Sequence, residues 1–334
     1  MKRNIVITGE TFNSAENYFS LYNKIQEIDI DDMVTKFVFA DTSENLAWVR
    51  RDKNNLGIVR KDIYLVSTAT GENQQDAYIN ALSRVKSESI NLVYATYPLN
   101  DNNGKTGSMI VAPEEAAYEE NSDISALYDM VTKRSQLTFT QSSVVEGKPV
   151  PWLDTRIPAT LREVVDYCRG AGAYKEFKGV TAGHFAVKLS DTEFLTSIRR
   201  TNFNDLDKIG LVYVKTDGPD SVIAYGAKPS VGGQSQRIVF NDHAGYDCIV
   251  HFHCKQKDDS SVPVKEQRDV ECGSHQCGKN TSDGLKDYGL LKAVMLKNHG
   301  PNIVFSSSAD PGKIIDFINE HWDLSSKTGG YNIA

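Results

Sequence analysis

The chain has 334 residues, of which 40% are hydrophobic and 24% charged, and its formal net charge is −7. This length favours two domains with substantial cores, and the lack of a basic block argues against nucleic acid as a partner. No run of 18 apolar residues occurs, which argues against a membrane span, and the first residues read as a strand rather than a signal peptide. We therefore expect a soluble cytoplasmic protein.

The first half alternates strand and helix signals. Strands are predicted at residues 4–8, 36–40, 62–67, 91–95 and 108–112. Helices are predicted at residues 15–28 and 77–85, the second because Ile79, Leu82 and Val85 recur at helical spacing. This alternation predicts an α/β domain with a mostly parallel, Rossmann-like sheet.

A change of composition separates the two halves. Residues 144–158 carry Gly147, Pro149, Pro151 and Pro158, which interrupt regular structure. We therefore predict a Rossmann-like domain at residues 1–150 and a second domain at residues 151–334. All five cysteines lie in the second half, and an odd number does not suggest the disulfide framework of a secreted protein.

The second half begins with a predicted helix, in which Thr160 is the N-cap and Glu163 completes a capping box. Two further helices are predicted at residues 234–243 and 314–322. Strands are predicted at residues 185–189, 193–196, 210–214, 221–225, 248–253, 294–297 and 303–305. The pattern predicts an α+β domain or an α/β/α sandwich.

Three histidines form a pattern typical of metal ligands. His251 and His253 end an apolar run, and a strand turns both side chains to one face. His299 follows 46 residues after His253, at the end of another apolar run. Three imidazoles with an open fourth position are typical of a catalytic zinc ion, one per chain, although another divalent transition metal would also fit. The alternative is that these are ordinary histidines near a sheet edge.

Four segments, in order, give the second half a resemblance to a known family. They are Gly183-His184-Phe185-Ala186-Val187-Lys188-Leu189, Phe194-Leu195-Thr196-Ser197-Ile198-Arg199-Arg200 with the strand after it, Lys228-Pro229-Ser230, and Lys297-Asn298-His299-Gly300. Together they resemble the class II (zinc-dependent) aldolase/adducin family between about residues 160 and 322.

The resemblance implies a site and a chemistry. The three histidines would hold zinc, which polarises a carbonyl while a proton or a carbon fragment leaves. The substrate would be a small anionic molecule, usually a phosphorylated sugar. By position, its binding residues would be Gly183, His184, Ser197, Arg199, Arg200 and Ser230. Members of the family are usually tetramers, so a homo-oligomer is expected.

Departures from the family pattern matter as much. The family has a carboxylate that acts as base three residues after the proline of Lys-Pro-Ser, and here that position is Gly232. The family's Asn after Gly is His184, and the glycine of its phosphate loop is replaced by arginine, giving Arg199-Arg200. A pair of arginines is a good ligand for phosphate or carboxylate, although it could equally be a solvated surface pair. The usual proton chemistry is therefore altered or lost.

A second cluster, Cys272, His275 and Cys277, follows Glu271. It could bind a second metal or supply a reactive thiol, but its spacing is too compact for a usual structural zinc site, so an ordinary loop is the simpler interpretation. Glu271 is a candidate replacement for the missing carboxylate. Tyr331, on the C-terminal tail, is a candidate catalytic residue because in the family a tail tyrosine assists proton transfer.

The first half carries a fainter resemblance. Ile5-Val6-Ile7-Thr8-Gly9-Glu10-Thr11 is similar to the opening strand and turn of phosphopantothenate–cysteine ligase-type domains, although Glu10 replaces the second glycine. A generic Rossmann-like domain explains the segment about as well.

These observations favour a zinc-dependent lyase, aldolase- or epimerase-like, acting on a small phosphorylated or carboxylated sugar derivative. One alternative is a non-catalytic, adducin-like binding or scaffold protein, which the loss of the carboxylate at position 232 favours. Another is a bifunctional fusion with a nucleotide-using first domain.

Overall fold

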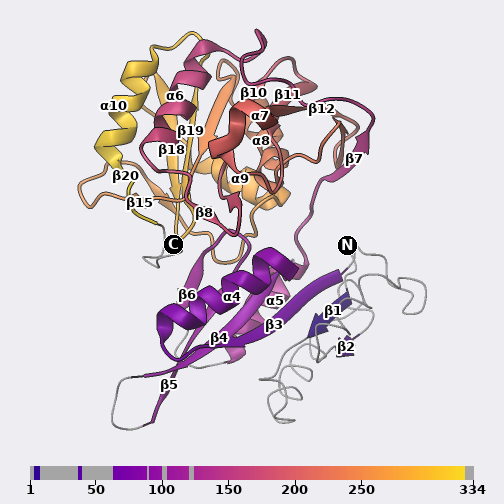
Figure 1. Cartoon of the computed structure of the whole chain (residues 1–334), viewed down its shortest axis with the longest axis vertical. Coiled ribbons are helices and arrows are strands. Elements are labelled where there is room, and N and C mark those ends of the chain that lie inside the picture. Colours follow the sequence, from indigo (N-terminus) through magenta and orange to yellow (C-terminus); the bar gives the residue numbers. More distant parts are fainter. Residues whose placement is uncertain are drawn as a thin grey trace. The chain divides into compact units, whose positions relative to one another are not determined.

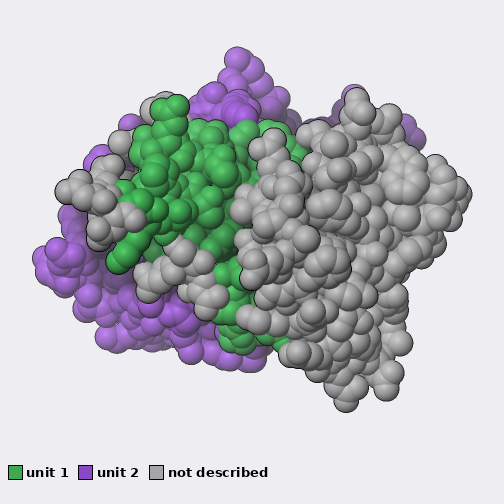
Figure 2. All heavy atoms as spheres, turned by 90° about the horizontal axis from the view of Figure 1, so that it is seen from below, with its two compact units in different colours: residues 1–137 green, residues 138–334 purple. Residues whose placement is uncertain are grey.

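The computed structural model describes residues 4–7, 37–39, 63–88, 90–99, 104–119 and 124–327. The chain divides into two compact units, residues 1–137 and 138–334 (Figure 2). The boundary expected near residue 150 lies inside the second unit, whose sheet includes residues 141–145. The predicted helix at residues 15–28 and Tyr331 lie outside the described residues. No helix in the described part of the chain is long and apolar enough to cross a membrane.

The first unit contains a six-stranded sheet in the order β2-β1-β3-β4-β5-β6 (Figure 1). Its strands are β1 (Asn4–Ile7), β2 (Phe37–Phe39), β3 (Ile63–Thr70), β4 (Leu92–Pro98), β5 (Thr106–Val111) and β6 (Ala117–Glu119). The four strands β2, β1, β3 and β4 are parallel, and β5 and β6 are antiparallel additions. The sheet is therefore mixed, and the unit belongs to the α/β class. The Rossmann-like assignment stays a prediction.

Two helices accompany this sheet, α4 (Gln74–Glu88) and α5 (Ile124–Ser135). Helix α5 buries Leu127, Met130 and Val131 in a cluster with strand residues of β3, β4 and β5. Its last turn carries Arg134, which is fully buried and ion-paired with Glu114 at 2.5 Å. Removal of either partner is expected to destabilise the first unit strongly, because the remaining charge would stay buried without its counter-charge.

The second unit is built on a ten-stranded sheet. Its main path is β16-β18-β19-β14-β10-β11-β12-β13-β7, and β17 pairs with β18. The strands are β7 (Gln141–Val145), β10 (His184–Lys188), β11 (Glu193–Ser197), β12 (Leu211–Thr216), β13 (Ser221–Tyr225), β14 (Cys248–His251), β16 (Val264–Lys265), β17 (Lys286–Asp287), β18 (Leu291–Leu296) and β19 (Gly300–Phe305). All neighbouring pairs are antiparallel except β7 with β13 and β16 with β18.

Smaller elements complete this unit. A short hairpin pairs β8 (Glu176–Phe177) with β9 (Val180–Thr181), and a separate two-stranded antiparallel sheet pairs β15 (Lys255–Gln256) with β20 (Trp322–Asp323). The helices are α6 (Ala159–Gly170), α7 (Leu206–Ile209), α8 (Val231–Asp242), α9 (His275–Gly284) and α10 (Pro311–His321), with a 3-10 turn at Phe203–Asp205.

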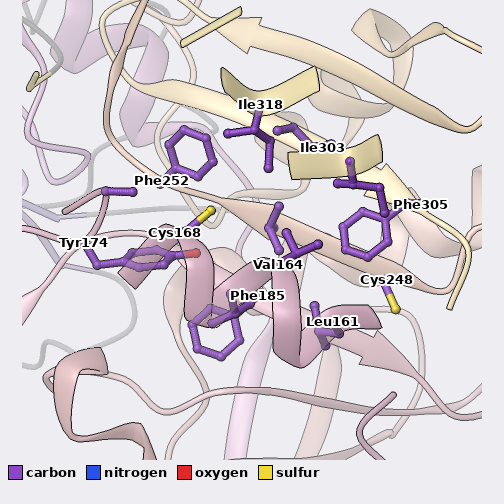
Figure 3. Close-up of a cluster of buried hydrophobic side chains, with 14 of the residues drawn as sticks. Leu161, Val164, Cys168, Tyr174, Phe185, Cys248, Phe252, Ile303, Phe305 and Ile318 are labelled. Atoms are coloured by element: carbon purple, nitrogen blue, oxygen red, sulfur yellow. The ribbon is translucent and has the colours of Figure 1, made fainter. Parts of the chain in front are cut away.

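Helices cover both faces of the second sheet. On one face, α6 and α10 bury Leu161, Val164 and Ile318 against Phe185 and Phe305 (Figure 3). On the other face, Val239 and Phe240 of α8 pack against the alternate strand positions, which include Ala186, Phe194, Val212 and Ile249. The alternation along β10 and β14 follows from the two-residue period of a strand. The second unit is therefore an α/β/α sandwich, one of the two architectures predicted.

The predicted capping box is wrong. Helix α6 is preceded by Pro158 as N-cap, with no side-chain cap, so Thr160 lies within the first turn. Proline is well suited to a helix start because its φ is already close to helical. The Thr160 hydroxyl instead donates towards the carbonyls of Ser307 and Ala309, at 2.8 and 3.1 Å.

Candidate metal centre

The three predicted metal ligands meet in the structure. His251 is the last residue of β14, His253 follows two residues later, and His299 precedes β19, the neighbour of β14 in the sheet. All three are buried, with exposures of 1%, 5% and 2%. One ligand atom from each lies within 4.8 Å of the others. The sheet thus brings together residues 46 and more positions apart in the sequence.

The spacing of the ring nitrogens fits a small cation. The Nε2 atom of His251 lies 3.1 Å from Nε2 of His299 and 3.1 Å from Nε2 of His253. Zinc–nitrogen bonds of 2.0–2.1 Å in a tetrahedron would place the nitrogens about 3.3 Å apart. The residues therefore fit a zinc-like ion, and three protein ligands would leave one position for a ligand from solution.

The tautomer of His251 also suits a ligand. Its Nδ1 lies 2.6 Å from the carbonyl oxygen of Pro301, which can only accept, so Nδ1 carries the proton. Nε2 is then a bare nitrogen that faces the other two rings. A backbone carbonyl in this role is typical of the outer shell around metal-binding histidines. Burial and the neighbouring His299 and His184 hold the pKa of His251 well below its usual range, which keeps the ring neutral.

Two glycines allow the strands to approach at this point. A Cβ on Gly300 would lie 2.0 Å from the carbonyl oxygen of Phe252, and a Cβ on Gly183 would lie 2.5 Å from that of His251. Both contacts are closer than real Cβ atoms tolerate. Asn298, with φ of 57°, adopts the left-handed conformation that asparagine tolerates better than most residues. The backbone that presents His299 therefore requires glycine at position 300 and favours asparagine at position 298.

A fourth imidazole lies beside the triad. His184 is the register partner of His251 across β10 and β14, and the two ring centroids are 4.7 Å apart. It is 5% exposed. Burial and the nearby His253 lower the pKa of His184 to about 3, so the ring is neutral at physiological pH.

Two residues that the sequence patterns did not single out hold His184. Gln236 of α8 is hydrogen-bonded through Nε2 to Nδ1 of His184, and the Thr196 hydroxyl of β11 donates to Gln236 Oε1 at 3.0 Å. Thr196 and Gln236 are buried, with exposures of 0% and 1%. Strand alternation could have placed Thr196 on the face of His184, but nothing in the sequence marked Gln236.

The predicted anion-binding residues are brought together in part. The segments around Ser197 and Ser230 run side by side, because Ser230 N donates to Ser197 O at 3.0 Å and Arg199 N to Lys228 O at 2.9 Å. Ser230 directly precedes α8. The buried Oγ of Ser197 makes no hydrogen bond within the described part of the chain. Arg200 is exposed and has φ of 58°.

The compact Cys/His cluster does not converge in the described structure. Cys277 is buried in α9 and its sulfur accepts from Gln267 Nε2 at 3.4 Å. His275 instead contacts the hydroxyl of Thr140 at 2.8 Å. Glu271 is buried in the turn before α9, and its carbonyl accepts hydrogen bonds from Ser274. These contacts fix the start of α9 and give the segment a structural role. Gly232, at the position where the family has its carboxylate, lies in the first turn of α8.

Comparisons with known proteins find matches of low similarity, to solved structures. No protein-family model matches the chain, and no curated protein matches its sequence. Among solved structures, L-fuculose 1-phosphate aldolase has 16% identity and a TM-score of 0.37, over 50% of this chain and 85% of its own. YgbL from Escherichia coli, described as a candidate aldolase/epimerase/decarboxylase, has 19% identity and a TM-score of 0.35, over 48% and 83%.

YgbL from Klebsiella pneumoniae, described in the same words, has 20% identity and a TM-score of 0.32, over 48% of this chain and 84% of its own. These structures are class II aldolase-like and cover about half of the chain. At such identities and TM-scores they add no argument about activity, which has to rest on the geometry of the site.

Proposed function

We propose that the second unit is a metal-dependent lyase or epimerase of the class II aldolase type, acting on a small phosphorylated or carboxylated sugar derivative. The observation that carries the proposal is the convergence of three buried imidazoles, two pairs of whose Nε2 atoms are 3.1 Å apart. A cation between the rings would accept a lone pair from Nε2 of each histidine.

His251, His253 and His299 would hold the ion, with zinc as the preferred metal because its tetrahedral site accepts three imidazoles and keeps one position open. When bound, the ion supplies Lewis-acid polarisation of a substrate carbonyl. The Pro301 carbonyl orients His251, and burial of all three rings excludes bulk water from the protein side of the site.

The substrate anion would bind where the segments of Ser197 and Ser230 meet, with Arg199 and Arg200 supplying charge. Gly183 borders the metal centre because it lies against the His251 carbonyl, and His184 contacts Gln236 of α8, the helix that Ser230 precedes. Backbone amides at the start of α8 favour negative charge. Glu271 and Tyr331 stay candidates for proton transfer. A homo-oligomer is proposed on the resemblance alone, and light scattering of the full chain tests it.

The competing proposal is a non-catalytic binding protein that keeps the metal. It is favoured by the glycine at position 232, where the family has its base. A screen of small sugar phosphates and sugar acids with zinc-loaded and metal-free protein separates the two. Turnover that requires the metal supports the enzyme, whereas metal-dependent binding without turnover supports the binding protein. Metal-free protein after expression in zinc-supplied medium would contradict both.

A further inference from the structure

Two buried hydrogen bonds connect Thr196 to Gln236 and Gln236 to His184. The donor and the acceptor of each bond can be assigned. Thr196 has one hydroxyl hydrogen and two acceptors in reach, Gln236 Oε1 at 3.0 Å and the Phe185 carbonyl at 3.2 Å. The shorter contact is to Gln236. With Oε1 accepting from Thr196, the amide nitrogen of Gln236 faces His184, as the structure has it.

An amide nitrogen can only donate, so Nδ1 of His184 must accept. A neutral imidazole has one donor and one acceptor. If Nδ1 accepts, the proton of His184 is on Nε2, the opposite tautomer to that of His251. Two neighbouring histidines, partners in register on β10 and β14, thus present different groups: His251 a bare Nε2 and His184 an Nε2–H.

We propose that Gln236 and Thr196 are positioning residues that lock His184 as a fixed hydrogen-bond donor beside the metal centre. His184 is then neither a fourth metal ligand nor a base. Its nitrogens are not among the ligand atoms that converge within 4.8 Å of one another, which agrees with a donor role. The inference about the bound molecule rests on the proposed function, whereas the tautomer itself does not.

The donor defines the chemistry of the ligand. An N–H next to the metal ligands pairs with an oxygen that can only accept, such as that of a phosphate or a carboxylate. A ligand that presents a hydroxyl or amine hydrogen at this point would oppose it, donor against donor. His184 therefore selects for an anionic oxygen at this position, where the family's asparagine could rotate to offer either a donor or an acceptor.

The direct test is nitrogen NMR of histidine-labelled protein, with and without zinc. The His184 signal is assigned from its loss in His184→Asn. We expect a proton-bearing Nε2 and a bare Nδ1 in both states. A proton on Nδ1 in wild-type protein would overturn the proposal. His243 is an internal reference, since Lys292 donates towards its Nδ1 at 3.3 Å and its Nε2 lies 3.1 Å from the Ser282 carbonyl.

The decisive variant is Gln236→Glu, which keeps the shape of the side chain but offers only acceptor oxygens when ionised. We expect the proton of His184 to move to Nδ1, while the His243 signals stay unchanged. A purely structural role for Gln236 predicts no such exchange. Thr196→Val, which removes the hydroxyl at nearly constant shape, should leave a mixture of the two tautomers. Unchanged tautomers in both variants would contradict the proposal that Gln236 and Thr196 fix the tautomer of His184.

Binding of inorganic phosphate tests whether the tautomer of His184 affects anion binding at the site. In zinc-loaded Gln236→Glu we expect an affinity about tenfold lower than in wild type, because a charge-assisted hydrogen bond is lost, with unchanged zinc content. Equal phosphate affinity would overturn the selection for an anionic oxygen. Failure to bind zinc at all would contradict the proposed function and would leave the tautomer result standing, so the two failures are distinguishable.

Discussion

Six of the seven histidines of this chain fall into two groups with different surroundings. His243, His275 and His321 each contact a hydroxyl or carbonyl oxygen of the protein, at distances of 3.1, 2.8 and 3.0 Å. The Nε2 atoms of His251, His253 and His299 face one another. The first three rings have oxygen atoms as their partners, whereas the ligand atoms of the second three converge at a point that fits a metal ion. The partners of each ring therefore distinguish the two groups.

The largest expected effect is the loss of bound zinc when one of the three facing histidines is replaced. His251→Ala should reduce zinc from about one ion per chain to near background, because three ligands become two. His243→Ala should keep its zinc, since its ring contacts Lys292 and Ser282. Elemental analysis of both purified variants, with circular dichroism to check folding, makes the measurement. Undiminished zinc in His251→Ala would place the metal elsewhere.

The second test concerns the backbone that presents His299. Gly300→Ala should destabilise the second unit by about 3 kcal/mol, because its Cβ would collide with the Phe252 carbonyl oxygen. Gly289→Ala is the matched control: its φ is 82° but nothing lies within 4 Å of the added Cβ, so only the cost of a left-handed residue, about 1 kcal/mol, is expected. Urea unfolding measures both. Equal losses would show that close approach at residue 300 is unimportant.

How far the sequence predicted these features depends on the range of each interaction. The His-x-His pattern and the Asn-His-Gly turn are local in sequence. The strand predicted at residues 248–253 ends at His251, however, so His253 lies beyond the strand and its position does not follow from strand periodicity. The hydrogen bonds that hold His184 are not local, because Gln236 is 40 residues from Thr196 and 52 residues from His184 in the sequence. A glutamine on a helix is unremarkable in a sequence, and only the packing of α8 on the sheet reveals its partners.

The same reasoning explains the fold predictions. The apolar patterns placed the seven predicted strands of the second unit close to β10, β11, β12, β13, β14, β18 and β19, but they missed shorter strands such as β16 and β17. They could not show that β7, which precedes the expected boundary, pairs parallel with β13. Nor could they show that Thr160 would be used against Ser307, 147 residues away, rather than as a cap.

A smaller effect is expected at the anion site, where the two arginines differ. Arg199 is half-buried and follows the strand that contains Ser197, whereas Arg200 is exposed. Arg199→Ala should weaken phosphate binding to zinc-loaded protein by about 1.5–3 kcal/mol if the charge-assisted bond is shielded from water. Arg200→Ala should cost about 0–1 kcal/mol because an exposed pair is screened. Isothermal titration calorimetry compares the two, and wild-type affinity in both would identify a solvated surface pair.

The smallest expected effect concerns His275 and the pH dependence of the free energy of unfolding. Burial lowers the pKa of His275, Asp220 opposes this and Arg237 adds to it. Because the folded-state pKa is the lower one, the unfolded chain takes up a proton first. Stability from this group is thus complete above the unfolded value of about 6.5 and is lost as the pH falls through the folded pKa.

His275→Gln removes this titration while leaving a polar side chain near Thr140 and Asp220. We expect the variant to lose less stability than wild type between pH 7.5 and pH 5, measured by urea unfolding of zinc-free protein so that metal release does not contribute. The direction follows from the sign of the shift, and equal pH dependence in both proteins would show that His275 titrates alike in the folded and unfolded chains. In that case its contact with Thr140 is available to either protonation state, and the contrast with the metal-centre histidines would rest on geometry alone.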